Sequence, residues 1–379
     1  MSKLLSRFGG SKKDLTSQEL KCAIRLLDDD DVLHTTFQRE HKGQYLLDYV
    51  FKSLNLLEKD YFGLRYVDEG NVQTRYWLDP TRSIVKQVKS LNPIIFCFRV
   101  KFYPADPHQL KEEISRYYLY LQLRRDLLNR RLYCLPADAT YLIACVIQSE
   151  LGDYDPEEHK GNYIADLKLI PSQNEKIEME AIEIHQNELR NQTPAEAELH
   201  FLERASKLET YGIDPHQVKD QQKNALFIGI NYSGILAFQS NRKKKNLIGF
   251  RCNNAAACTN LWRCAVEQRY FFTMNSSLEI PSVTTGGTGF LFAKQCKLRY
   301  SGRVEREIIE DMKKVNASGG SSAAGSVSTI NRRHSINSNV PLSMRSIGRS
   351  NTAPLPNNES PDFNSSIYQD KSKHLLFGV

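Results

Sequence analysis

The sequence lacks the features of a secreted or membrane-spanning protein. The first ten residues, Met1–Gly10, have no apolar core of the kind that a secretory signal peptide contains. The longest apolar run, Tyr141–Ile147, falls far short of the ~20 residues that a spanning helix needs. The eight cysteines are scattered through core-like patterns, which is typical of a reducing compartment rather than of a disulfide framework. We therefore expect a cytoplasmic protein that is soluble or peripheral to a membrane.

Patterns that carry catalysis or metal binding are also missing. The nine histidines are dispersed and form no H-x-x-x-H pair, and no Ser/His/Asp constellation can be argued. Cys252, Cys258 and Cys264 are evenly spaced, but zinc sites favour two close pairs of ligands, and no histidine lies nearby. We expect all three to be buried structural cysteines. The glycine-rich stretch 285–289 lacks the lysine of a phosphate-binding loop. The sequence predicts neither an enzyme nor a cofactor.

The charge balance is mild. The chain has 51 basic and 44 acidic residues and a formal charge of +7. This excess permits attraction to acidic lipid headgroups or acidic proteins. No arginine-rich stripe with interleaved aromatic residues is present, so we do not expect nucleic-acid binding.

Residues 20–104 predict a small α+β lobe. The order of elements is ββαββαβ, which by fold analogy is typical of a ubiquitin-like roll. The expected strands are 20–28, 32–39, 61–67, 76–79 and 94–101, with a helix at 43–56 and a short helical stretch after Pro80.

A strand then leads into a helical region. Pro104 ends the strand, Asp106 stands where an N-cap belongs, and Pro107 suits the first helical position. We expect a helix from there through Leu128. Further helices are expected at 138–151 and 175–190, and from the capping box at Thr193 to a stop at Gly212.

The remaining chain predicts strands, one helix and a tail. Strands are expected at 225–231, 235–240 and 245–251, followed by a helix at 255–272. Beyond Val315 the chain turns to Ser, Asn, Gly and Arg. Such a segment buries too little apolar surface to offset its ordering entropy, so 316–379 is predicted to be disordered.

This order of lobes resembles the FERM domain, and several motifs look like band 4.1-type signatures. They are E-K-D-Y-F-G-L-R-Y-V (58–67), Y-W-L-D-P (76–80), F-R-V-K-F-Y-P-A-D-P (98–107), Q-S-E-L-G-D-Y-D-P (148–156), L-E-T-Y-G-I-D-P-H (208–216) and L-W-R-C-A-V-E (261–267). Residues 292–304 resemble the FERM-adjacent segment of that subfamily. The match spans about residues 20–305.

The resemblance implies a multi-lobe α+β protein. The expected parts are a flexible N-terminus (1–19), a ubiquitin-like first lobe (20–104), an acyl-CoA-binding-protein-like helical second lobe (105–212), a pleckstrin-homology-like third lobe (213–275), a linker with the FERM-adjacent segment (276–315) and a disordered tail (316–379).

The third lobe is shorter than the pattern requires. A pleckstrin-homology-like sandwich has seven strands before its helix, and only three are predicted between Ala225 and Asn254. Four more strands need roughly 30–40 residues. The sequence therefore indicates an internal deletion near 241–246, either in a true variant or from a faulty gene model. In the family, tail peptides often add as a strand to this lobe, so we expect weak tail binding here.

Four groups of residues are candidate sites. Arg242, Lys243, Lys244 and Lys245 form the densest basic run, either an anionic-lipid contact or a solvated hairpin loop. Trp262 is either a partner anchor or a core residue. Ser335 follows a basic pair typical of kinase sites, and Thr352 lies in a segment that resembles a ligand of 14-3-3 proteins.

The resemblance implies a non-enzymatic adaptor at the inner face of the plasma membrane or at cell junctions. Its expected partners are cytoplasmic tails of membrane proteins, acidic phospholipids including phosphoinositides, cortical cytoskeletal proteins, and 14-3-3 proteins through the tail. The alternative is a fragment or splice form of a larger FERM protein, such as a FERM tyrosine phosphatase, that lacks tail binding by the third lobe.

Overall fold

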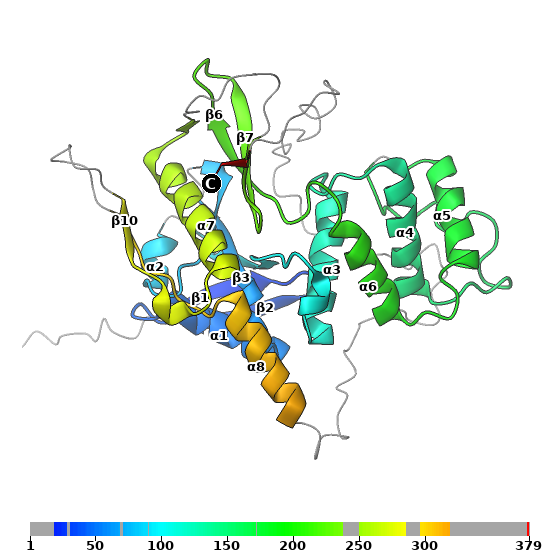
Figure 1. The fold of residues 1–379 in the computed structure, drawn as a ribbon, viewed down its shortest axis with the longest axis horizontal. Coiled ribbons are helices and arrows are strands. Elements are labelled where there is room, and N and C mark those ends of the chain that lie inside the picture. The colour runs from blue at the N-terminus through cyan, green and yellow to red at the C-terminus, as the bar shows by residue number, and fades with distance from the viewer. Residues whose placement is uncertain are drawn as a thin grey trace, which may run out of the picture.

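The computed structural model describes most of the chain and places three groups of elements around a shared centre (Figure 1). The described residues are 19–28, 31–68, 71–89, 91–171, 173–237, 250–285, 296–318 and 377–378. Within these ranges no helix combines the length and the apolar character needed to cross a membrane.

The first lobe is a five-stranded sheet with two helices. Its strand order is β2-β1-β5-β3-β4, in which β1 and β5 run parallel and the other neighbours antiparallel. The elements are β1 (Leu20–Arg25), β2 (Val32–Phe37), α1 (Gly43–Leu54), β3 (Phe62–Asp68), β4 (Asn71–Trp77), α2 (Ile84–Gln87) and β5 (Ile95–Val100). The long helix and four of the predicted strands are present, whereas the strand predicted at 76–79 is displaced, because β4 begins at Asn71 and ends at Trp77. Alternate residues such as Ile24, Phe96 and Phe98 are fully buried beneath α1 residues such as Leu46.

The second lobe contains four helices: α3 (Glu113–Leu128), α4 (Pro136–Leu151), α5 (Glu175–Asn187) and α6 (Pro194–Ala205). The prediction that the first of them begins at Pro107 is wrong. Asp106 does cap a turn, since its Oδ1 accepts the N–H of His108 at 3.0 Å, but that turn is the 3-10 helix η2 (Pro107–Gln109). The next N–H groups, of Lys111 and Glu112, donate to the carboxylate of Glu58 instead of continuing a helix.

The helix predicted from Thr193 has the right start and the wrong end. Both hydrogen bonds of the capping box with Glu196 are present. The helix ends at Ala205 rather than near Gly212, because the chain turns there to bring Tyr211 to the strand that leaves the first lobe. The hydroxyl of Tyr211 donates to the carbonyl of Pro104 at 2.8 Å.

The third lobe is one antiparallel sheet covered by a helix. The strand order is β12-β8-β7-β6-β9, with β6 (Asp214–Lys219), β7 (Ala225–Asn231), β8 (Gly234–Ala237), β9 (Arg251–Cys252) and β12 (Phe377–Gly378), and the helix is α7 (Ala255–Thr273). The predicted hairpin and helix are confirmed. Of the strand predicted at 245–251, only the last two residues are described, and β9 begins at Arg251.

Strand β6 was not predicted, and it contains Pro215, a residue type that is disfavoured within central strands. The structure resolves the conflict through register. All six residues of β6 pair with β7, whereas only Val218 and Lys219 pair with β9. Pro215 therefore lies where no ladder hydrogen bond to β9 is required of it.

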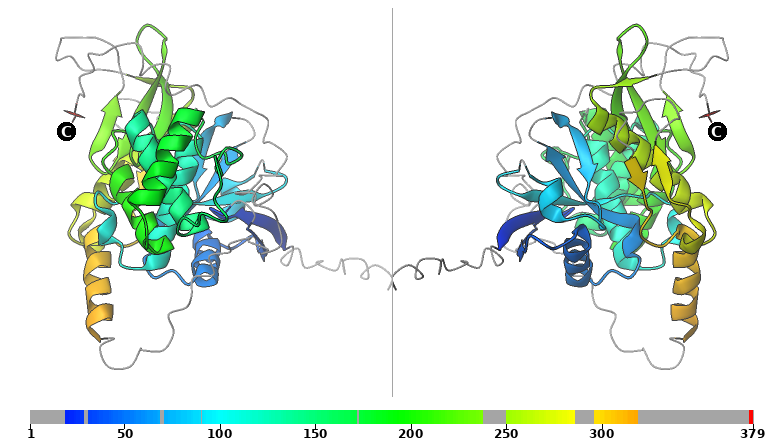
Figure 2. Two further views of the ribbon diagram at one scale, coloured as in Figure 1. Left: turned by 90° about the vertical axis from the view of Figure 1, so that its right-hand side faces the viewer. Right: turned by 90° about the vertical axis from the view of Figure 1, so that its left-hand side faces the viewer.

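Helix α8 (Glu305–Ser318) was also not predicted, and it extends past the expected start of the tail at residue 316. It projects from the end of the molecule opposite β6 and β7 (Figure 2). Ile308 and Met312 are buried against the core. Between α7 and α8 lie η3 (Ser277–Glu279) and the strand pair β10 (Val283–Thr285) and β11 (Cys296–Leu298). The rest of the predicted disordered tail, apart from β12, lies outside the described residues.

The first two lobes share one hydrophobic core, to which α7 and α8 contribute Phe271, Ile308 and Met312. Phe271 of α7 is fully buried and stacks on Phe102 of the first lobe, with ring centroids 4.1 Å apart. It also meets the ring of Tyr61 edge-on at 5.1 Å. Burial of a phenylalanine side chain stabilises the folded state by about 1.5–3 kcal/mol. Helix α7 is therefore packed against the first lobe as well as against its own sheet.

Candidate functional site

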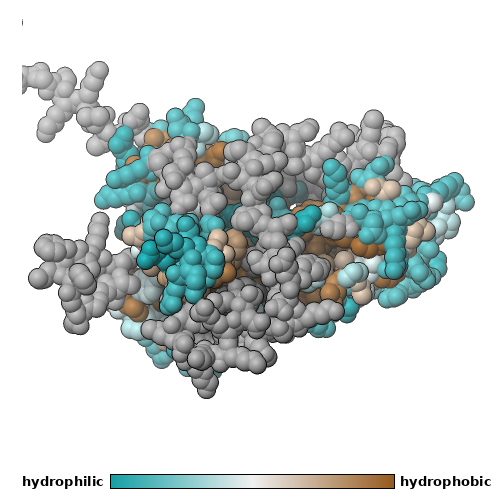
Figure 3. Space-filling model, turned by 90° about the horizontal axis from the view of Figure 1, so that it is seen from above, coloured by the Kyte–Doolittle hydropathy of each residue, from teal (hydrophilic) through white to brown (hydrophobic). Residues whose placement is uncertain are grey.

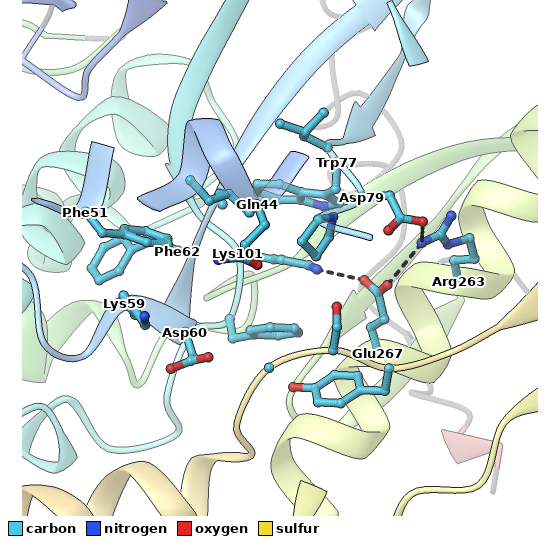
Figure 4. A pocket seen from close by; sticks show the side chains of 18 of the residues that line it. Gln44, Phe51, Lys59, Asp60, Phe62, Trp77, Asp79, Lys101, Arg263 and Glu267 are labelled. Atoms are coloured by element: carbon cyan, nitrogen blue, oxygen red, sulfur yellow. Dashed lines mark hydrogen bonds and ion pairs between the residues drawn. The ribbon is translucent and has the colours of Figure 1, made fainter. Parts of the chain in front are cut away.

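A chain of four charges joins α7 to the first lobe (Figure 4). Lys101 Nζ lies 2.8 Å from a carboxylate oxygen of Glu267, and Arg263 lies 3.6 Å from Glu267 and 2.8 Å from Asp79. Burial raises the pKa of Asp79, but hydrogen bonds from Thr81 and Arg263 outweigh it, and the pKa is lowered. The carboxylate therefore stays charged and holds Arg263.

Side-chain amides of α7 bind the backbone of the same lobe. Asn260 Nδ2 donates to the carbonyl of Arg75 at 3.1 Å, and Gln268 Nε2 donates to the carbonyl of Lys101 at 3.0 Å. A cavity of about 90 Å³ lies beside this contact between α7 and the first lobe, and Trp77 and Tyr300 form part of its lining. Pockets for drug-sized ligands have volumes of about 300–1,000 Å³. The contact between α7 and the first lobe is therefore an interface between lobes rather than a small-molecule site.

Deeper in the interface, β6 contributes Asp214 and His216. Asp214 forms an ion pair with Arg65 of β3, and its second oxygen lies 3.3 Å from His216 Nε2. Burial raises the pKa of Asp214, but the charges of Arg65 and His216 hold it well below its usual range. Burial lowers the pKa of His216, but Asp214 opposes this more strongly and raises it to about 10.

The ligand atoms of Asp214, His216 and Cys264 lie within 4.8 Å of one another, as a metal site would require. The chemistry of these groups does not fit a metal ion. Arg65 already forms an ion pair with Asp214, and its guanidinium would repel a cation at the same position. The cluster is best described as a buried ion-pair network.

This result corrects two predictions about the cysteines. A histidine does lie beside Cys264, because the fold brings β6 against α7. Cys264 is buried as expected, but Cys258 is exposed and Cys252 only partly buried.

The network continues to the second lobe with an excess of positive charge. We name as the junction cluster the residues Arg65, Arg75, Asp126, Arg131, Asp214 and His216. Arg131 at the end of α3 lies 3.8 Å from Asp126. Among the described residues Arg75 has no ion-pair partner, and burial together with repulsion from Arg131 and Arg65 lowers its pKa to about 9. Arg75 remains charged at neutral pH, so three guanidinium groups and one imidazolium face two carboxylates.

The predicted site residues lie elsewhere. Trp262 is half-buried on α7 next to Arg263. The basic run Arg242–Lys245 and the sites Ser335 and Thr352 lie outside the described residues. No local spacing in the sequence links the members of the junction cluster, because they come from four separated segments: β3, β4, the end of α3 and β6.

Sequence comparison identifies the first two lobes. Residues 24–90 match the family model of the FERM N-terminal domain, and residues 105–216 match that of the FERM central domain. Protein 4.1 of Bos taurus is 40% identical over 318 residues, which cover 76% of this chain and 50% of that protein. Band 4.1-like protein 4A of Homo sapiens is 36% identical over 330 residues, or 78% of this chain and 47% of that protein. The chain spans about half the length of these curated relatives.

Structural comparison agrees on the fold. The FERM and C-terminal domain complex of Drosophila Merlin matches with a TM-score of 0.57 and 21% identity, over 67% of this chain and 96% of that one. The Dictyostelium discoideum myosin VII MyTH4-FERM MF2 domain (mutant 1) matches with a TM-score of 0.52 and 17% identity, over 67% of this chain and 61% of that one. The chain is therefore a FERM-domain protein of the band 4.1 superfamily.

Proposed function

We propose that this protein is a non-enzymatic adaptor that joins the inner face of the plasma membrane, including cell junctions, to the cortical cytoskeleton. Its FERM domains and its similarity to Protein 4.1 and Band 4.1-like protein 4A support the proposal. The mechanism is surface complementarity: positive charge steers the protein to an acidic leaflet, and grooves bind extended peptides. The ubiquitin-like, acyl-CoA-binding-protein-like and pleckstrin-homology-like identities of the lobes, with the boundaries given above, belong to this proposal.

The proposed binding of acidic phospholipids is supported mainly by the unpaired charge of Arg75 in the junction cluster. A phosphate group brings oxygens that arginine binds in a bidentate manner, and such bonds are about twice as strong as neutral ones. A phosphoinositide headgroup would relieve the repulsion among Arg65, Arg75 and Arg131. The basic run Arg242–Lys245 would add a weaker, non-specific attraction to the same leaflet.

Tail binding by the third lobe is proposed to be weak. Between Asp214 and α7 the described residues form four strands of one sheet. That is fewer than the seven of a complete sandwich. The arrangement favours a shortened form of a larger FERM protein, with Trp262 as a remaining contact for partners and Ser335 and Thr352 as regulatory phosphorylation sites in the tail, the latter for 14-3-3 proteins.

The proposal is tested by sedimentation with vesicles of phosphatidylcholine that contain either phosphatidylinositol bisphosphate or phosphatidylserine at equal charge. We expect preferential binding to the phosphoinositide, and a loss of about tenfold in Arg75→Gln. Arg190→Gln is the control, because it removes the same charge from an exposed position in the second lobe. Equal binding by the wild type and Arg75→Gln would exclude the junction cluster as the lipid site.

A further inference from the structure

The second lobe carries a groove that is separate from the junction cluster and from the third lobe. It lies between the segment after α4 and one face of α5. Its volume is about 390 Å³, more than four times that of the cavity between α7 and the first lobe. Its lining residues are Tyr154, His159, Gly161, Lys176, Met179, Glu180, Ile182, Glu183 and Gln186.

The groove has an apolar floor, an aromatic wall and an acidic rim. Ile182 is 4% exposed and forms part of the floor, and the ring of Tyr154 stacks on His159 at 5.8 Å. Glu180 and Glu183 are exposed one turn apart on α5. Met179 beside them is 49% exposed, so an apolar side chain faces solvent next to these carboxylates.

The support beneath the groove is fixed by hydrogen bonds. His185 on the buried face of α5 is fully buried, with Nδ1 2.7 Å from the Tyr163 hydroxyl and Nε2 2.8 Å from the carbonyl of Gly152. The N–H of Asp155 donates to His159 Nδ1 at 2.9 Å. These bonds tie the segment after α4 to itself and to α5, so a ligand would meet a groove that is already formed.

We propose that this groove binds a short extended segment of another protein that carries a lysine or arginine next to an apolar residue. The cationic group would lie between the carboxylates of Glu180 and Glu183 and over the ring of Tyr154, where the ring face attracts a cation. The apolar neighbour would cover Met179.

Charge complementarity decides the kind of partner. The chain as a whole has a formal charge of +7, yet the exposed surface of α5 is acidic, and this end of the molecule is mostly hydrophilic in the view from above (Figure 3). The single lysine in the groove, Lys176, lies 3.8 Å from Glu180 with 84% of its side chain exposed. Exposed pairs of this kind contribute about 0–1 kcal/mol, so an incoming cation can replace Lys176. An acidic leaflet or a phosphate would be repelled from the same surface.

The groove is independent of the lipid proposal. The junction cluster involves the α3 end of the second lobe, whereas α5 lies at the far edge of the molecule (Figure 1). Loss of phosphoinositide binding in Arg75→Gln would leave this inference untouched.

The test uses the full chain and a fluorescein-labelled hexapeptide in which arginine alternates with leucine. Binding is followed by fluorescence anisotropy and by the methyl resonance of Met179 in protein labelled at the methionine methyl groups. We expect saturable binding that shifts the Met179 resonance and weakens at least tenfold in Glu183→Lys. A peptide with glutamate in place of arginine should not bind.

Glu157→Lys is the matched control, because it makes the same charge change on a side chain that is 90% exposed and does not line the groove. We expect its affinity to stay within twofold of the wild type. Equal weakening in Glu157→Lys and Glu183→Lys would show only non-specific attraction and overturn the proposal, as would binding that leaves the Met179 resonance unmoved.

Discussion

Replacing Asp214 with asparagine should destabilise the interface between the first and third lobes. The side chain is the shared partner of Arg65 and His216 in the junction cluster. Asparagine keeps the volume but removes the negative charge, which leaves an uncompensated guanidinium in a buried site. Removing one partner of a buried ion pair costs about 3–5 kcal/mol. We expect a loss of that size in the local free energy of unfolding at pH 7.

The assay should report on the interface rather than on the whole chain, because unfolding of a multi-lobe protein need not be two-state. Hydrogen exchange read by mass spectrometry on peptides from β6 and α7 gives that local free energy. Peptides from α4 and α5 serve as the internal reference, since these helices are remote from the cluster. Glu209→Gln is the control variant, because it makes the same charge change at an exposed position.

A double-mutant cycle separates the pair from general effects. Arg65→Met alone leaves Asp214 with His216, so its cost should be smaller than that of Asp214→Asn. In the double variant the two costs should not add, with a coupling of about 0.5–3 kcal/mol. A loss below ~1 kcal/mol in Asp214→Asn, or strict additivity in the cycle, would refute the view that this ion pair holds the lobes together.

Two further changes test the α8 contact and the turn before β6. Burial raises the pKa of Glu305 to about 7, and its Oε1 accepts a hydrogen bond from the Tyr61 hydroxyl at 3.3 Å. Because the folded form binds this proton more tightly than the unfolded form, protection of α8 against hydrogen exchange should increase as the pH falls from about 7 to 4.5, and Glu305→Gln should remove that dependence. Gly212 has a φ of +65°, and an added Cβ would lie 2.8 Å from Cβ of Tyr103, so Gly212→Ala should lower the melting temperature by several degrees. Gly161→Ala, with a φ of +62° and no atom within 4 Å, should cost less, and equal effects would show that backbone conformation alone, rather than the contact, sets the cost.

Local patterns in the sequence were sufficient for most individual elements. The alternation of apolar residues predicted the strands of the first lobe, and the capping box at Thr193 fixed the start of α6. These signals succeed because each depends on residues within a few positions of one another. The boundaries at Pro107 and Gly212 were placed wrongly because hydrogen bonds to distant acceptors competed with the local signals: Lys111 and Glu112 donate to Glu58, and Tyr211 donates to Pro104.

The sequence by itself determined the family, through motifs spread over residues 58–267, and the absence of any catalytic spacing. Only the tertiary structure decided where charge accumulates. Arg65, Arg131 and Asp214 are separated by dozens of residues, and they meet because the three lobes pack against one another. Burial then turns these ordinary surface-type residues into a strongly interacting cluster, since charges interact more strongly where water is excluded.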